Sequence, residues 1–490
     1  MAPLRSMLQR KLHTHSNVEP MRALFTLFLL INLAACKPTD ELPPPEANEH
    51  LSGGTTSVTA QHRDAFSQPA RNLAPEQRLQ FSVGNSFFRN PWVMAPATTT
   101  ARDGLGPLFN SNACQNCHIR DGRGRLPTQT NQQPISLLVR LSQPADPQNP
   151  QHMQLMRELG NIPDEVYGLQ LQDMAVPTVR PEVRIRLSYQ SHEEVFRDGT
   201  RVTLRKPLLH LDQWGYGAPP QDTQYSLRLA PPMIGLGLLE SIPETAILNG
   251  IHSPEKIAWG VQGTANHVWD REQQKTVLGR FGWKAGQPSI AQQNAQAFVS
   301  DMGLTSAIFP QDECTETQVN CQQAAHGGEP EVSENIAQHV LFYTRHLGVP
   351  QRRNLHDAQV LAGRRLFHQA GCQHCHTPRF VTDAKASEPS LANQVIYPYS
   401  DLLLHDMGEG LADQRGEFLA NGQQWRTAPL WGLGLTERVS GQVNLLHDGR
   451  ARSILEAILW HGGEAQKSKD AVLNFNAVER ENLLRFLNSL

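Results

Sequence analysis

The sequence has no excess of charge of either sign. Among its 490 residues, 44 Lys and Arg stand against 47 Asp and Glu, which leaves a formal net charge of −3. Binding to a nucleic acid backbone calls for a basic surface that this balance does not provide. We therefore exclude nucleic acid as a partner, and the length predicts two or three domains.

Long apolar runs are also scarce. The run ALFTLFLLINLAA at 23–35 is too short to span a bilayer, but it follows an arginine and ends in small residues, which is typical of an export signal. Its last residues with Cys36, LAAC, resemble the lipobox of bacterial lipoproteins, in which the signal is cut before the cysteine and lipid is attached to it. We expect a signal peptide over 1–36, a lipid anchor on Cys36 and a periplasmic protein. Lys37 favours the outer membrane; the alternative is an uncleaved hydrophobic helix.

Cysteine is rare, with seven in the chain. One would carry the lipid, four form two CxxC pairs, and Cys314 and Cys321 remain in a polar stretch. In an oxidising periplasm two cysteines so close in sequence are expected to form a small disulfide. The alternative is two free thiols.

The segment after the lipobox has no apolar period. It is rich in proline, glycine, serine and threonine, which predicts a flexible tether over 37–75. Recurring apolar residues begin near residue 76, and we expect ordered structure from there.

Two segments occur twice, which indicates two related halves. LFNSNACQNCH at 108–118 matches LFHQAGCQHCH at 366–376, and RLAPPMIGLGL at 228–238 resembles RTAPLWGLGL at 426–435. Both pairs keep the same order. We expect one domain enlarged by insertions over 76–345 and a second, related domain over 346–490.

Helical periodicity is stronger than strand periodicity. Apolar residues recur at helical spacing over 332–347, 356–367, 453–460 and 477–490. Strand signals are few and short, for instance 183–187 and 202–204. We predict a mainly α fold with long loops and a few short strands.

Each CxxC pair is followed directly by histidine, which is the attachment signature of c-type haem. The two cysteines form thioethers with the haem vinyl groups, and the histidine ligates the iron. The motifs are Cys114, Cys117 and His118, and Cys372, Cys375 and His376. A zinc site would place its pairs closer together, and a redox dithiol would lie beside a βαβ pattern that is missing here. We therefore expect two covalently bound haem c groups, and with them a mainly α fold of two cytochrome c-like haem domains, over 76–345 and 346–490.

From Phe81 to Leu490 the chain resembles the di-haem oxidoreductase family. The resemblance rests on GLGPLFNSNACQNCHIRDGRG, LGRFGWKAGQPSIAQQNAQAF, YSDLLLHDMGEGLAD, WRTAPLWGLGL and LLHDGRARSILEAILWHGGEA. That family belongs with the bacterial di-haem cytochrome c peroxidases and with an enzyme that matures a tryptophan-derived quinone cofactor.

The resemblance implies a second axial ligand for the second haem just after the HDG turn and its helix. The matching residue is His461, where the peroxidases usually have methionine; a histidine would lower the potential. The alternatives are a helix-end histidine that caps carbonyl groups, with His405 or Met407 as the ligand. The peroxidases often have a distal histidine soon after the first motif, but the next one here, His152, lies in a polar loop. The first iron is therefore expected to be five-coordinate or weakly ligated.

A peroxide site also needs an acid/base group, for which Glu240 is our first candidate and His210 the second. Trp283 in RFGWKA is the candidate for the aromatic side chain that lies between haems in this superfamily; the alternative is a simple core residue. Arg450 could pair with a haem propionate or form a loop salt bridge.

Three functions remain open. The first is a peroxidase-like enzyme that reduces hydrogen peroxide at the first haem with electrons relayed through the second. The others are a di-haem electron-transfer protein and an oxidase of a protein or thiol substrate. The expected electron donor is a small cytochrome c or cupredoxin, or a quinol-linked donor.

Overall fold

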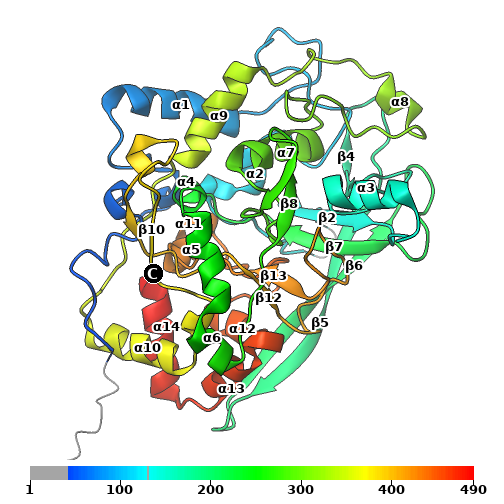
Figure 1. The fold of residues 1–490 in the computed structure, drawn as a ribbon. Coiled ribbons are helices and arrows are strands. Elements are labelled where there is room, and N and C mark those ends of the chain that lie inside the picture. The colour runs from blue at the N-terminus through cyan, green and yellow to red at the C-terminus, as the bar shows by residue number, and fades with distance from the viewer. Residues whose placement is uncertain (1–41, 130–131) are drawn as a thin grey trace, which may run out of the picture. The chain divides into compact units, whose positions relative to one another are not determined.

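Short helices and small antiparallel sheets alternate along the chain (Figure 1). The computed structural model describes residues 42–129 and 132–490, and those from 44 onward form one unit. The expected signal peptide, with Cys36, lies outside the described residues. Within the described ranges, no helix is both long and apolar enough to cross a membrane.

The four helices expected from periodicity are confirmed as α9, α10, α12 and α14. The α-helices are α1 Pro75–Arg89, α2 Cys114–Cys117, α3 Pro150–Leu159, α4 Leu236–Glu240, α5 Glu244–Asn249, α6 Pro254–Trp259, α7 Ile290–Met302, α8 Val319–Gln322, α9 Glu334–Arg345, α10 Ala358–Gln369, α11 Thr436–Ser440, α12 Ile454–Leu459, α13 Gln466–Leu473 and α14 Ala477–Ser489. The four expected helices begin where a polar side chain accepts a backbone N–H: Ser333, Asp357, Ser453 and Asn476. Such N-caps fix where a helix starts.

The prediction of a mainly α, cytochrome c-like fold is wrong. The structure is 32% helical and 17% strand, and its strands form many small sheets. The strands are β1 Leu108–Phe109, β2 Leu137–Ser142, β3 Gln170–Leu171, β4 Met174–Ala175, β5 Arg184–Val195, β6 Arg201–Asp212, β7 Gln224–Leu229, β8 His267–Asp270, β9 Lys275–Leu278, β10 Phe380–Val381, β11 Val395–Ile396, β12 Leu404–Asp406 and β13 Gln424–Arg426.

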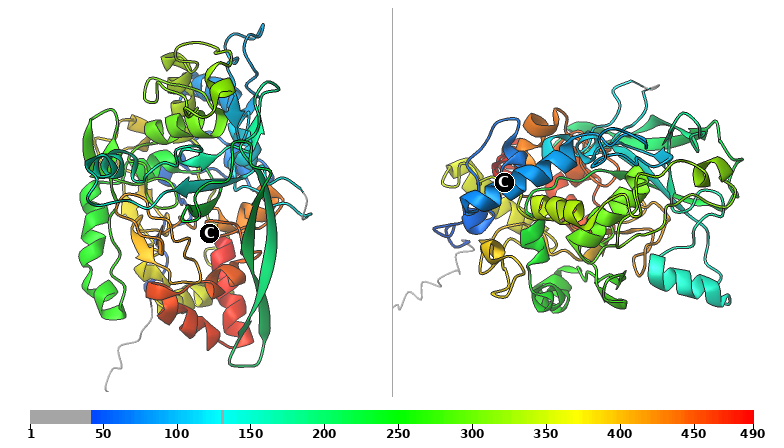
Figure 2. Two further views of the ribbon diagram at one scale, coloured as in Figure 1. Left: turned by 90° about the vertical axis from the view of Figure 1, so that its right-hand side faces the viewer. Right: turned by 90° about the horizontal axis from the view of Figure 1, so that it is seen from above.

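The two longest strands form one hairpin, β5–β6. The sequence signals covered only part of each strand. The half of β5 next to the turn is largely exposed and lacks an apolar alternation, and in β6 the proline at 207 interrupts the strand pattern. The turn contains Asp198 and Gly199, and Gly199 has a φ of 84°, which favours glycine. The hairpin runs beside the C-terminal helices (Figure 2), where Arg197 N donates to Leu473 O and Lys469 pairs with Glu194.

A three-stranded sheet, β3-β2-β7, supplies one wall of the first CxxCH site. Alternation along β2 directs Val139 and Leu141 into a buried apolar cluster. Leu138 and Arg140 face the opposite side, where they line a cavity. Antiparallel pairing with β7 places Leu138 opposite Arg228. This sheet therefore carries two arginines to the same site.

Each CxxCH motif follows a helix that packs closely against a second helix. In the first half Gly84 of α1 approaches α9, where an added Cβ would lie 2.1 Å from the carbonyl oxygen of His339. In the second half Gly363 of α10 approaches α14, where the distance to Asn482 O would be 1.9 Å. Buried aromatic side chains fill both contacts, such as Tyr343 in the first. The division into two domains at 345 stays a prediction.

The tether predicted over 37–75 does not describe residues 44–75, which pack against the rest of the chain. Glu49 is buried and pairs with Arg352, and Phe66 is fully buried in a core cluster. Val58 N also donates to Val349 O. The proline and glycine content reflects short turns in this segment, whose polar side chains have partners that the sequence does not reveal.

Candidate functional site

The first CxxCH motif opens on a large cavity, called the first cavity. His118 is anchored by its Nδ1, which lies 2.7 Å from the carbonyl oxygen of Pro231. That contact puts the proton on Nδ1 and leaves the lone pair of Nε2 available to a metal. Burial lowers the pKa of His118 to about 4, so the ring is neutral at pH 7. With Cys114 and Cys117 it lines about 1800 Å³ of empty space.

The second motif is built in the same way. Cys372 begins a 3-10 turn, and the Nδ1 of His376 lies 2.9 Å from the carbonyl oxygen of Tyr399. Burial lowers the pKa of His376 to about 4. With Cys372 and Cys375 the histidine lines the second cavity, of about 1350 Å³. Both motifs thus present a neutral imidazole with a free Nε2 beside two cysteines.

Among the candidate second ligands, His461 has the chemistry of a ligand and His405 does not. His461 lines the second cavity, and its Nδ1 lies 2.7 Å from Ala457 O, which leaves Nε2 free. Burial lowers the pKa of His461. His405 uses both nitrogens on carboxylates, Asp401 at 3.0 Å and Glu464 at 2.8 Å. Burial alone would lower the pKa of His405, but Asp401 holds it well above 6.5.

Met407 also lines the second cavity. Its thioether needs no deprotonation and stays a rival ligand by position. The spin state of the second iron in variants of His461 and Met407 distinguishes the two.

The four motif cysteines are free thiols in two separate places. Because the pairs line different cavities, they cannot share one zinc ion. Burial raises the pKa of Cys114 and Cys372 to about 12, so neither is a thiolate at neutral pH. Redox dithiols and zinc ligands need an accessible thiolate. The thiols fit attachment to an apolar macrocycle better than either alternative.

Two arginines test whether the cavities suit a haem. Arg123 and Arg426 line both cavities, and neither forms an ion pair within the described residues. Arg123 donates to Leu446 O at 3.1 Å, and Arg426 donates to Gly282 O at 2.9 Å. Burial lowers the pKa of each to about 10. Haem propionates would supply the missing carboxylates, so the residues present fit the group.

Trp283 stands where the two cavities meet. It is 8% exposed and lines both of them. Its Nε1 donates to Leu229 O at 2.8 Å, and the guanidinium of Arg123 lies 5.3 Å from the centre of its ring. The ring is therefore held in one orientation between the two cavities, and a role for Trp283 in electron transfer stays a prediction.

The two acid/base candidates do not line either cavity. Glu240 ends α4, where its carboxylate accepts the N–H of Ile290 at 2.8 Å and pairs with Arg345 at 2.7 Å. His210 is exposed on β6 and contacts Ser188 Oγ. Neither side chain can therefore act on a ligand in the first cavity. Glu240 links α4 to α7 and α9, and His210 faces solvent.

Arg450 forms a salt bridge in its loop, which was the alternative to pairing with a haem propionate. It pairs with Asp448, with Nη2 2.7 Å from the carboxylate, and donates to Gly410 O. It lines neither cavity, so it does not meet a cofactor there. His152 lies on exposed α3, away from the first cavity, as expected from its polar surroundings.

Sequence reasoning missed the cavity-facing arginines. Arg228 and Arg426 both begin the repeated R-x-A-P segments, and both line the first cavity. The repeat could have marked them, because a charged residue at the start of two matching apolar segments is unusual. Arg123 and Arg140 carried no such signal. The site also gains Glu417 from the second half of the chain.

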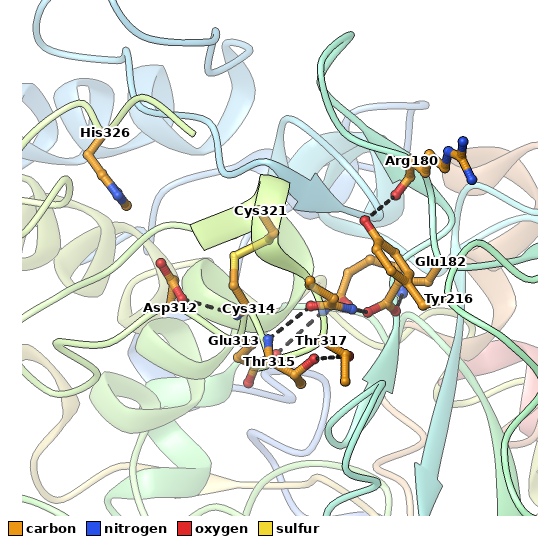
Figure 3. Close-up of a disulfide and its surroundings, with 12 residues drawn as sticks. Arg180, Glu182, Tyr216, Asp312, Glu313, Cys314, Thr315, Thr317, Cys321 and His326 are labelled. Carbon is orange, nitrogen blue, oxygen red and sulfur yellow. Dashed lines mark hydrogen bonds between the residues drawn. A yellow bond between two sulfur atoms is a disulfide. The ribbon is translucent and has the colours of Figure 1, made fainter. Parts of the chain in front are cut away.

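The predicted disulfide between Cys314 and Cys321 is present, with a Cα–Cα distance of 5.7 Å (Figure 3). It holds a polar loop against the inserted strands. Next to it, Gln318 Nε2 donates to Glu182 at 2.6 Å and Thr315 donates to Val166 O at 2.8 Å. Since it lines neither haem cavity, its role is to fix this loop.

Comparison with known families now adds to this geometry. A family model described as "Di-haem oxidoreductase, putative peroxidase" matches residues 47–490. A comparison with curated proteins found no match. The family match spans nearly the whole chain and includes both cavities and both CxxCH motifs. This protein therefore belongs to the di-haem oxidoreductase family.

Proposed function

We propose that this chain is a c-type di-haem oxidoreductase that reduces hydrogen peroxide at the first cavity with electrons relayed through the second. One observation carries the proposal: the two cavities differ in the histidines that could bind an iron opposite the CxxCH histidine. In the second, His376 and His461 each have a free Nε2 and a pKa lowered by burial. His447 also lines it with a lowered pKa, but its ring stacks on Trp425 and its Nε2 lies 3.6 Å from Asp448. His118 is the one histidine among the described residues of the first.

This difference would give the two sites different roles, electron transfer at the second and binding of the oxidant at the first. Two strong ligands make a six-coordinate iron suited to electron transfer, and a single histidine leaves a position to which a small oxidant can bind. When bound, haem supplies the one-electron redox chemistry. Reduction of one peroxide to two waters takes up two electrons and two protons, and the electrons come from a partner.

Covalent attachment is the finer part of the proposal. In each motif, two free thiols lie beside an anchored histidine that lines the same cavity. Addition of each thiol across a vinyl group gives a thioether and fixes the ring over the histidine. Arg123 and Arg426 would hold propionates, and Trp283 would lie on the path of the electrons between the two sites.

Export is the second finer part. The segment 23–35 and the LAAC sequence support a lipid anchor on Cys36 and a periplasmic location, since c-type haem attachment and the Cys314–Cys321 disulfide both belong to an oxidising compartment. A small cytochrome c, a cupredoxin or a quinol-linked protein is the proposed electron donor. Globomycin-sensitive processing and palmitate labelling of wild-type and Cys36→Ala protein would test the anchor.

The proposal is tested on protein produced with a c-type haem maturation system. A pyridine haemochrome assay should give two c-type haems per chain, and the protein should consume peroxide in proportion to oxidation of a reduced donor. One haem, or none, would contradict the cofactor assignment. Two haems without peroxide-dependent donor oxidation would contradict the activity alone.

Electron transfer without substrate chemistry is the second candidate function. It is favoured by Met233 and Met302, which both line the first cavity and could complete the coordination of its iron. In that case both irons are low-spin in the wild type, and Met302→Leu or Met233→Leu creates a high-spin iron. If neither substitution changes the spectrum, the first iron has no methionine ligand.

A further inference from the structure

The first cavity contains an arginine, Arg140, that has no partner among the residues the structure describes. Arg140 lies on β2 and is half-buried, and alternation along the strand points it into the cavity. Within the described part of the chain its guanidinium makes no hydrogen bond and no ion pair. A guanidinium has five donors, and most buried donors in proteins are satisfied.

The position of Arg140 differs from that of the other arginines at this site. Arg228 already pairs with Asp413 and Glu417. Arg123 and Arg426 line both cavities, whereas Arg140 lines the first alone. Arg140 therefore does not lie at the junction of the two cavities, where Arg123 and Arg426 would bind propionates.

Arg140 also lines an adjoining pocket of about 490 Å³, and the residues common to the two spaces are called the neck. The two spaces share Arg140, Gln287, Gln296 and Glu417. Partly exposed Arg271 lines the adjoining pocket but not the cavity. The neck is thus polar, in contrast to the largely apolar cavity, and it suits a small polar ligand.

No carboxyl group among the described residues near Arg140 pairs with its guanidinium. Asp301, Glu313 and Glu417 lie within electrostatic range but form no ion pair with it. Glu417 is engaged by Arg228 and Arg415, and Glu313 accepts the hydroxyl of Ser300 at 2.7 Å.

We propose that Arg140 binds a small oxygen anion, such as hydroperoxide, inside the first cavity through charge-assisted hydrogen bonds. This assignment rests on the proposed function, because it requires an iron in the first cavity with a position open to ligands. Arg140 would orient the ligand and stabilise its negative charge, and the neck with Gln287, Gln296 and Glu417 would be its route.

The test compares two ligands on the haem-loaded protein. Fluoride, bound to the oxidised protein, is anionic and accepts hydrogen bonds; carbon monoxide, bound to the reduced protein, is neutral and accepts them poorly. Because Arg140 has no protein partner, Arg140→Gln leaves no group unsatisfied and should fold normally. Arg140→Lys keeps the charge, and Arg271→Gln is the matched control from the adjoining pocket.

Arg140→Gln should weaken fluoride binding by about 10- to 100-fold, since hydrogen bonds to charged groups are strong. Arg140→Lys should lose less, Arg271→Gln should match the wild type, and carbon monoxide affinity should stay within about twofold throughout. Unchanged fluoride affinity in Arg140→Gln, with a shifted haem potential, would mean that Arg140 holds a propionate and would overturn the assignment. Equal loss of both ligands would reduce it to a structural role. A wild type that binds neither ligand would overturn the proposed function as well.

Discussion

Replacing Arg123 with leucine should destabilise the haem-loaded protein by about 3 kcal/mol or more. Arg123 is 8% exposed, lines both cavities and lacks an ion-pair partner in the described residues. A haem fits these cavities if one of its propionates pairs with the guanidinium of Arg123. The substitution tests that fit because the sign of the change in the free energy of unfolding depends on whether a propionate pairs with Arg123.

The magnitude follows from the surroundings of Arg123. Burial lowers its pKa from 12.5 to about 10, which corresponds to a cost of about 3 kcal/mol for keeping the charge. Leucine removes that cost but loses the hydrogen bond to Leu446, about 1 kcal/mol, and the contact with Trp283, about 1 kcal/mol. Without a counter-ion the variant would be more stable by about 1 kcal/mol. With a propionate, loss of one partner of a buried pair costs about 3–5 kcal/mol.

Guanidinium chloride unfolding of the haem-loaded proteins, followed by far-ultraviolet circular dichroism, measures the difference. Arg353→Leu is the matched control, because burial also lowers the pKa of Arg353 to about 10, yet it lines neither cavity. That variant should change little. An Arg123→Leu protein as stable as the wild type, or more stable, would refute the reasoning.

Three further predictions follow from the site. His461→Ala should convert the second iron to high spin in the electronic spectrum, whereas Met407→Leu should leave it low-spin; the reverse pattern would make Met407 the ligand. Because Asp401 holds the pKa of His405 well above 6.5, His405 contributes stability that is complete below about pH 6.5 and fades as pH rises toward the folded-state pKa; His405→Gln should remove that alkaline decline in urea unfolding. Glu240→Gln should leave peroxide turnover unchanged while it lowers the free energy of unfolding by about 1–3 kcal/mol, so a specific loss of turnover would restore Glu240 as a catalytic residue.

The sequence predicts well those features whose chemistry needs contiguous residues. A CxxCH motif works only when cysteines and histidine are adjacent, so Cys114 to His118 and Cys372 to His376 could be found without a structure. The Cys314–Cys321 disulfide is similar, because its partners are close in the chain. Helices with N-caps and apolar periodicity, such as α9 and α14, also follow from local sequence.

Features that depend on contacts between distant segments could not be predicted. Glu240 looked like an acid at the end of an apolar run, yet Arg345, far along the chain, takes its carboxylate. Arg140 reaches the first cavity only because β2 pairs with β7. The full length of the β5–β6 hairpin was not predicted for a related reason, since the exposed end of β5 is stabilised by its pairing with β6 and by the ion pair of Glu194 with Lys469 of α13.

Electron paramagnetic resonance of the fully oxidised wild-type protein tests the central claim most directly. The unequal ligand sets of the two cavities predict one high-spin ferric iron, at His118, and one low-spin iron with the signature of two histidine ligands, at His376 and His461, in equal amounts. Addition of peroxide to the half-reduced protein should change the high-spin signal first. Two low-spin irons that stay unchanged with peroxide would contradict the account.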